Sequence, residues 1–254
     1  MPLRIAMVVP LLRREREIMP ESRALAEEEA LFLLLELNDA LFPIGAYAHS
    51  YGLETYVQQG LVHDAATAGK WLQAYFSGNF LYGELLSARL AYEAFPEPDG
   101  IERLQTLEEE VRAARVPREP REALQKLGRR LAKNAMKIGL PFDSRFGDYV
   151  KAAEQSSSHP VCYGALAAAL GLPERAALQH YLYAQLSALT NTCVKLIPLS
   201  QTDGARLVAS FRKRYSTYID MALAADADDL CLSSPGLDIR AMQHEVLYSR
   251  LYMS

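Results

Sequence analysis

The sequence predicts an all-α protein folded as a single-domain, multi-helix bundle. It contains 39 Leu and 36 Ala against 11 Val, 8 Ile and 7 Thr, and this balance favours helices over strands. We find no period-two alternation, no Asn-Gly hairpin turn and no internal repeat. Half of the 254 residues are hydrophobic and 23% are charged, which suits a folded core. No linker divides residues 23–254, and residues 1–22 are expected to form a disordered, mixed-charge tail.

Local signals place the helices of the first half. Helices are predicted over residues 23–40, 50–59, 65–95, 101–114 and 121–138. Ser22 is expected to cap the first helix, and Pro43 to end it. Gly60 closes the second helix, and Asp64 caps the third. The segment 96–120, rich in Pro, Glu and Arg, is expected to be the most loop-like part of the chain.

The second half is predicted to contain further helices, over residues 148–153, 161–170, 174–196, 203–225 and 238–250. Ser158 can cap and Pro160 can open the second of these. That helix and the next are rich in Ala, Gly and Ser, so their axes can approach closely. We expect this pair to lie at the centre of the bundle. Ser200 and Asp203 have the spacing of a capping box.

The segment 38–54 is the most unusual in composition, because it combines Pro43, two glycines and several aromatic residues. It is either a binding loop that presents Tyr47, His49 and Ser50 or an interhelical connection whose aromatic side chains fill the core. Serine-hydrolase chemistry is disfavoured because the chain has no nucleophile-elbow motif. It also has no phosphate-binding glycine motif for a nucleotide.

The sequence assigns no metal site. Its five histidines and three cysteines form none of the spacings that place two ligands together. A transient nickel contact through His49, Cys231 or His244 stays open, since imidazole and thiolate ligands suit nickel. The alternative is that these are ordinary buried or solvated side chains. No stably bound cofactor is expected.

Charge and cysteine content indicate the setting of the protein. The net charge is -4 and the pI about 5.8, so neither a nucleic acid nor an anionic membrane is expected as a partner. Three widely spaced cysteines indicate a reducing compartment. The apolar run 31–37 is too short to span a bilayer. We therefore expect a cytoplasmic protein.

Two segments are candidate protein-binding surfaces. Tyr183 lies in a tyrosine-rich stretch, and tyrosine is enriched at protein interfaces, although it is equally common in helix cores. The chain also stays apolar almost to its last residue, through Tyr248, Leu251 and Tyr252. Because chain ends are usually polar and loose, this tail must dock, either on its own core or on a partner. In the second case Arg250 could supply a forked contact.

Four blocks of sequence resemble the family of urease accessory proteins called UreF. They are LNDALFPIGAYAHSYGLET (37–55), Tyr163-Gly164 with the Ala-rich helix to Gly171, Asn191 with VKLIPLSQTDG (194–204), and Met242, His244-Glu245 with YSRLYMS (248–254). They occur in the family's order. One departure is Ala46, where many members have a second glycine.

This resemblance implies a non-enzymatic, all-α dimer that assists urease maturation. It implies binding to the accessory protein UreD, also called UreH, recruitment of the nickel-carrying GTPase UreG, modulation of that GTPase, and nickel delivery to apo-urease. The carried-over partner-binding residues are Tyr47, His49, Tyr183, Lys195, Tyr248, Arg250, Leu251 and Tyr252. The rival hypothesis is a metallochaperone that binds nickel directly.

Overall fold

The computed structural model describes residues 26–45, 49–232 and 234–252, and within these ranges every regular element is a helix. The all-α prediction is confirmed. The predicted tail 1–22 and the Ser22 cap lie outside the described residues. No helix in these ranges is both long enough and apolar enough to cross a membrane.

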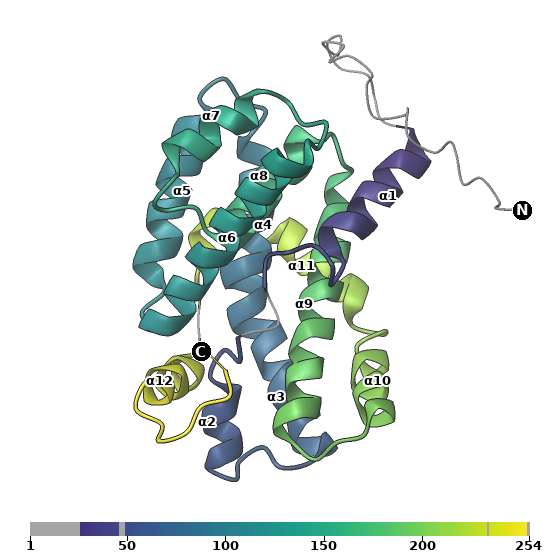
Figure 1. Cartoon of the computed structure of the whole chain (residues 1–254), viewed down its shortest axis with the longest axis vertical. Coiled ribbons are helices and arrows are strands. Elements are labelled where there is room, and N and C mark those ends of the chain that lie inside the picture. The colour runs from purple at the N-terminus through teal and green to yellow at the C-terminus, as the bar shows by residue number, and fades with distance from the viewer. Residues whose placement is uncertain (1–25, 46–48, 233, 253–254) are drawn as a thin grey trace, which may run out of the picture.

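The chain up to residue 94 forms α1 (Glu27–Asn38), α2 (Leu53–Gln58), α3 (Ala65–Tyr75), the π-helix η2 (Phe76–Leu85) and α4 (Leu86–Ala94). Of these, α3, η2 and α4 follow one another without a break and form one long, partly irregular rod (Figure 1). The predicted cap at Asp64 is confirmed, because its side chain accepts the Thr67 N–H at 2.8 Å. The single predicted helix 65–95 is continuous but contains a π-helical stretch, in which the turns are wider than in an α-helix.

The rest of the chain, from residue 100 on, surrounds this rod. Its elements are α5 (Gly100–Ala114), α6 (Arg118–Ile138), α7 (Arg145–Ala152), α8 (His159–Ala169), α9 (Glu174–Leu196), α10 (Gln201–Ser210), α11 (Tyr215–Ala224), the 3-10 turn η3 (Ala227–Asp229) and α12 (Pro235–His244). Gly139 ends α6 with φ +78°, a conformation that glycine adopts without strain. The capping box of Ser200 and Asp203 is also present.

The helix predicted over residues 101–114 is confirmed as α5, which turns an apolar face that includes Leu104 and Val111 into the core. Since α5 and the start of α6 occupy most of residues 96–120, the expectation that this segment is the most loop-like is wrong. Two other predicted helices have different bounds. The predicted helix 203–225 is two helices, since Phe211 packs against Phe76 (ring centroids 5.7 Å apart) and the chain turns there. The last helix ends at His244, not at Arg250.

Helix α8 lies at the centre and packs most extensively against α4 and α6. Nearly all of its residues are buried. A Cβ atom at Gly164 would lie 2.0 Å from the Ala88 carbonyl oxygen, so the two backbones touch only because this residue is glycine. The prediction of close approach by small residues holds, but the closest partner of α8 is α4 and not α9.

Two carboxyl groups are buried in this core. Glu84 of η2 is 1% exposed and accepts the Tyr75 hydroxyl at 2.9 Å, with Arg115 at 3.9 Å. Glu108 of α5 accepts the Ser158 N–H with both oxygens, at 3.0 and 2.9 Å, and the Tyr149 hydroxyl at 2.6 Å. The Ser158 side chain makes no capping hydrogen bond, so the predicted serine cap is absent. Glu108 instead satisfies the N–H group of Ser158 itself at the start of α8.

Candidate functional site

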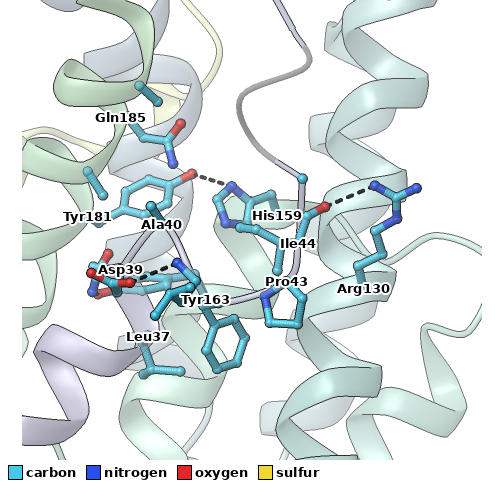
Figure 2. A pocket seen from close by; sticks show the side chains of 16 residues that line it. Leu37, Asp39, Ala40, Pro43, Ile44, Arg130, His159, Tyr163, Tyr181 and Gln185 are labelled. Atoms are coloured by element: carbon cyan, nitrogen blue, oxygen red, sulfur yellow. Dashed lines mark hydrogen bonds between the residues drawn. The ribbon is translucent and has the colours of Figure 1, made fainter. Parts of the chain in front are cut away.

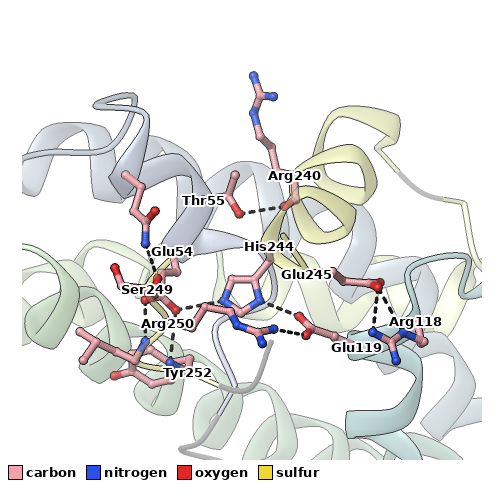
Figure 3. Close-up of polar contacts among 12 residues, drawn as sticks. Glu54, Thr55, Arg118, Glu119, Arg240, His244, Glu245, Ser249, Arg250 and Tyr252 are labelled. Atoms are coloured by element: carbon pink, nitrogen blue, oxygen red, sulfur yellow. Dashed lines mark hydrogen bonds and ion pairs between the residues drawn. The ribbon is translucent and has the colours of Figure 1, made fainter. Parts of the chain in front are cut away.

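The C-terminal segment, residues 245–252, is fastened to the body of the protein by its backbone and by the charged side chains of Glu245 and Arg250 (Figure 3). Glu54 of α2 is 3% exposed and accepts the backbone N–H groups of Leu251 (2.7 Å) and Tyr252 (3.2 Å). Gln58, one turn along α2, donates to the Ser249 carbonyl oxygen at 2.8 Å. These bonds position the segment beside α2.

His244 joins two carboxylates beneath this segment. It is fully buried, with Nε2 3.0 Å from Glu54 and Nδ1 2.6 Å from Glu119 of α6. Each ring nitrogen thus faces a carboxylate oxygen of a different helix, so the His244 ring bridges α2 and α6. The Arg250 guanidinium donates to Oε1, the other carboxylate oxygen of Glu119, at 2.7 Å. The four side chains form what we call the tail anchor: Glu54, Glu119, His244 and Arg250.

Local backbone geometry allows the tail anchor to form. Gly52 has φ +84° and precedes α2, and a Cβ there would lie 3.1 Å from the Ala241 nitrogen of α12. A glycine therefore lets α12 approach α2 closely. The Thr55 hydroxyl then donates to the Arg240 carbonyl oxygen at 2.9 Å. At the far side, Arg118 pairs with Glu245 at 2.9 Å.

The anchored segment presents apolar side chains to solvent. Val246 is 83% exposed, Leu251 is 79% exposed and Tyr248 is as exposed as in an extended chain. The tail thus docks on its own body through backbone and charge, with Leu247 and Tyr252 half-buried, while the side chains of Val246, Tyr248 and Leu251 stay uncovered. Exposed apolar groups on a rigidly held segment are typical of a protein-binding surface.

A second candidate region is the cavity beside the loop that follows α1 (Figure 2). It has a volume of about 420 Å³ and is lined by residues 37–45 together with side chains of α6, α8 and α9. Arg130 and Asn134 of α6 hold the loop, donating to the carbonyl oxygens of Ile44 (3.1 Å) and Pro43 (2.9 Å). His159 is buried against Tyr181, and burial lowers its pKa to about 4, so it is neutral.

The predicted site residues fall in several places. Tyr248, Arg250, Leu251 and Tyr252 come together at the tail. Tyr47 lies outside the described residues. His49 is 4% exposed, and its pKa falls to about 4 because of burial and then of the nearby Lys126 and Arg130.

Two further predicted residues lie on α9. Tyr183 is 55% exposed, and Lys195 is exposed in the last turn. They belong to different turns of α9 and do not join the tail anchor. Both side chains are exposed on the surface of α9, where a partner protein can reach them.

The weak metal candidates do not meet. Within the described ranges, no three or more His, Cys, Asp or Glu side chains are grouped so that they could hold a metal ion. His244 is engaged with two carboxylates. Cys231 is half-buried, and burial raises the pKa of its thiol, which makes it a poorer ligand because metals bind the thiolate.

Sequence reasoning missed Glu54 and Glu119, which carry the tail anchor. Both are glutamates in helices, where glutamate is an ordinary surface residue. One signal was available for Glu54, since it lies two residues after a glycine inside the unusual segment 38–54. Nothing local marks Glu119, because its partners lie 125 and 131 positions along the chain.

Comparison with known proteins gives a consistent result. A sequence model of the UreF family matches residues 62–212. The chain is 36% identical over 222 residues to the urease accessory protein UreF of Actinobacillus pleuropneumoniae, covering 87% of this chain and 97% of the relative. It is 34% identical over 224 residues to UreF of Arthrobacter sp. strain FB24, covering 87% and 96%. To UreF of Haemophilus influenzae strain PittEE it is 37% identical over 227 residues, covering 87% and 94%.

Proposed function

Because this chain belongs to the UreF family of urease accessory proteins and so acts in urease maturation, we propose that it is the scaffold of the maturation complex. It links the UreD/UreH accessory protein to the GTPase UreG and modulates the GTP-dependent insertion of nickel into apo-urease. It catalyses no reaction itself and works as a homodimer in the cytoplasm. Nickel is the cargo of this complex, and its contact with this chain is transient.

The exposed apolar tail is the observation that carries this proposal. Tyr248 and Leu251 lie in a segment that hydrogen bonds and ion pairs hold against the body of the protein. Their own side chains nevertheless stay exposed to solvent. A pre-ordered backbone lowers the entropy lost when a partner covers such side chains. Tyr248, Leu251 and Tyr252, together with Arg250, are therefore proposed to contact UreD/UreH.

The remaining predicted residues are assigned to other faces. Tyr183, exposed on α9, is proposed to lie at the dimer or partner face. The loop with Tyr47 and His49, and Lys195 at the end of α9, are proposed to lie near the surfaces that form the complex. The absence of a nucleotide-binding motif in this sequence supports the assignment of GTP to the partner.

The test replaces the two exposed side chains without touching the tail anchor. The double variant Tyr248→Ala and Leu251→Ala, co-expressed with UreD/UreH and UreG, is expected to lose complex formation in size-exclusion chromatography with light scattering. Loss of two central apolar contacts weakens binding by about tenfold or more. Its thermal unfolding is expected to match the unmodified chain, because neither side chain is buried.

A matched control removes exposed apolar area elsewhere. Met221 and Leu232 are 39% and 52% exposed, and their alanine double variant is expected to bind normally. Unmodified protein should elute with two copies of this chain in the complex. If the tail variant binds UreD/UreH as tightly as the unmodified chain, the tail is not the docking surface.

A further inference from the structure

We propose that one face of α6 is a second docking surface, which takes the acidic surface of another protein of the maturation complex. This face, here called the basic stripe, consists of Lys126, Arg129, Arg130, Lys133 and Lys137. The inference rests on the proposed function, because it assigns a further contact to the same assembly. It concerns residues that neither the tail anchor nor the family motifs include.

The spacing of these residues places them on one side of the helix. Lys126, Arg129, Lys133 and Lys137 follow one another by three or four positions, and Arg130 lies four after Lys126 and three before Lys133. All five are exposed and lie on one side of the helix. The segment 126–137 (KLGRRLAKNAMK) contains no acidic residue. Within the described part of the chain, no carboxylate pairs with any of the five cations. The basic stripe is therefore a positively charged surface on a protein whose net charge is -4.

The fold itself does not require this arrangement. Positive charges near the C-terminus of a helix are favourable, but that effect is confined to the last turn, where Lys137 lies. Lys126 and Arg129 lie two to three turns earlier. Like charges three and four residues apart repel each other and weaken the helix. A negatively charged partner removes this repulsion.

Two of the five side chains are held in place. Arg129 donates to the Gln155 carbonyl oxygen at 3.4 Å, and Arg130 donates to Ile44 at 3.1 Å. Each guanidinium has five N–H groups, so most of its donors stay available. Fixed guanidinium groups recognise carboxylates with less loss of side-chain entropy than free ones.

A protein surface fits the stripe better than a nucleic acid does. Eleven residues separate its ends, which corresponds to about 16 Å of helix, short for a groove that follows a phosphate backbone. Met136, 48% exposed, borders the stripe one turn from Lys133. An apolar side chain beside a row of cations suits an acidic helix or strand of a partner protein.

Charge reversal tests this assignment. The variant Lys126→Glu, Lys133→Glu and Lys137→Glu leaves both arginines, which hold carbonyl groups, unchanged. The matched control reverses three exposed cations in the turn between α10 and α11, Arg212→Glu, Lys213→Glu and Arg214→Glu. Both variants carry the same net charge. Association with purified UreD/UreH, UreG and apo-urease is measured separately by biolayer interferometry at low and high salt.

At low salt, we expect the association rate constant of the stripe variant with one of these proteins to be at least about tenfold below that of the unmodified chain. We also expect this rate constant to depend less on salt concentration than it does for the unmodified chain. The control should behave as unmodified protein. Equal rates for the stripe variant and the unmodified chain, or an equal loss in the control, would overturn the inference. So would stripe-dependent binding to an RNA or DNA duplex in place of all three proteins. If the unmodified chain binds none of the three, the proposed function itself fails.

Discussion

Glu108 is a buried carboxyl group whose pKa lies well above its usual value. Burial raises its pKa from 4.5 to about 7, although hydrogen bonds from Tyr149 and Ser158 act in the opposite direction. The folded protein therefore binds a proton at this carboxyl more tightly than the unfolded chain does. Its contribution to stability is complete below about pH 4.5 and is lost as the pH rises through 7.

The substitution Glu108→Gln should remove this dependence. A shift from 4.5 to about 7 corresponds to roughly 3 kcal/mol of unfolding free energy. We expect the difference in unfolding free energy, unmodified chain minus variant, to fall by up to this amount between pH 4.5 and 8. Urea unfolding at a series of pH values measures it.

The difference between the two chains is needed because other groups titrate in the same range. Burial lowers the pKa values of His49 and His159 to about 4, so their contribution is present above pH 6.5 and is lost as the pH falls. This effect is common to both chains and cancels in the subtraction. Parallel pH profiles for the two proteins would show that Glu108 does not titrate in this window.

At the scale of elements, the packing of α8 on α4 depends on one absent side chain. Gly164→Ala would place a Cβ atom 2.0 Å from a carbonyl oxygen of α4, and backbone atoms yield less readily than side chains. The helices would have to separate. We expect a loss of about 1–3 kcal/mol in unfolding free energy and a lower melting temperature by calorimetry.

Gly147 in α7 provides the matched control for this substitution. A Cβ there meets nothing within 4 Å, and alanine is the better helix former. Gly147→Ala should leave stability unchanged or raise it by about 0.5–1 kcal/mol. If Gly164→Ala were equally harmless, the contact between the α8 and α4 backbones would not limit the packing.

The break between α10 and α11 shows what decides a helix boundary when local signals are weak. Residues 203–225 contain no proline and a single glycine near the start, so their sequence permits one long helix. Phe211 is 4% exposed and also lies 6.3 Å from the Tyr218 ring. Phe211, Tyr218 and Ile219 are spaced to share one face of a straight helix, so their burial does not require the break. The two helices instead pack on different neighbours, α10 on α9 and α3, and α11 on η2, α4 and α9.

At the scale of the whole molecule, one continuous hydrophobic core joins α1, the α3–η2–α4 rod and the helices that surround it. Trp71 is the chain's one tryptophan and is 5% exposed within this core. Its fluorescence therefore reports on α3, whereas far-UV circular dichroism reports on all helices at once.

We expect these two signals to change together on chemical denaturation. A single core makes the unfolding of one part costly for the rest, so the transitions should share a midpoint and a slope. Measuring both in the same urea titration checks the prediction of one domain over residues 23–254. Two separate midpoints would show that the chain unfolds as more than one unit.

The sequence by itself determined the helical class and several helix starts and ends. These depend on neighbours in the chain, as with the caps at Asp64 and Ser200 and the stop at Gly139. The family resemblance was also carried by contiguous motifs, and the match to known UreF proteins confirms it.

Tertiary structure alone decided the contacts between distant segments. Glu54 meets residues of the tail 197 and 198 positions away, so the chain after His244 lies beside α2 and does not continue α12. The central partner of α8 was settled in the same way, by the backbone space at Gly164. The partner of a buried carboxylate, or of the space at a glycine, depends on which distant segment the fold places beside it. Helix propensity and local residue spacing do not specify that segment.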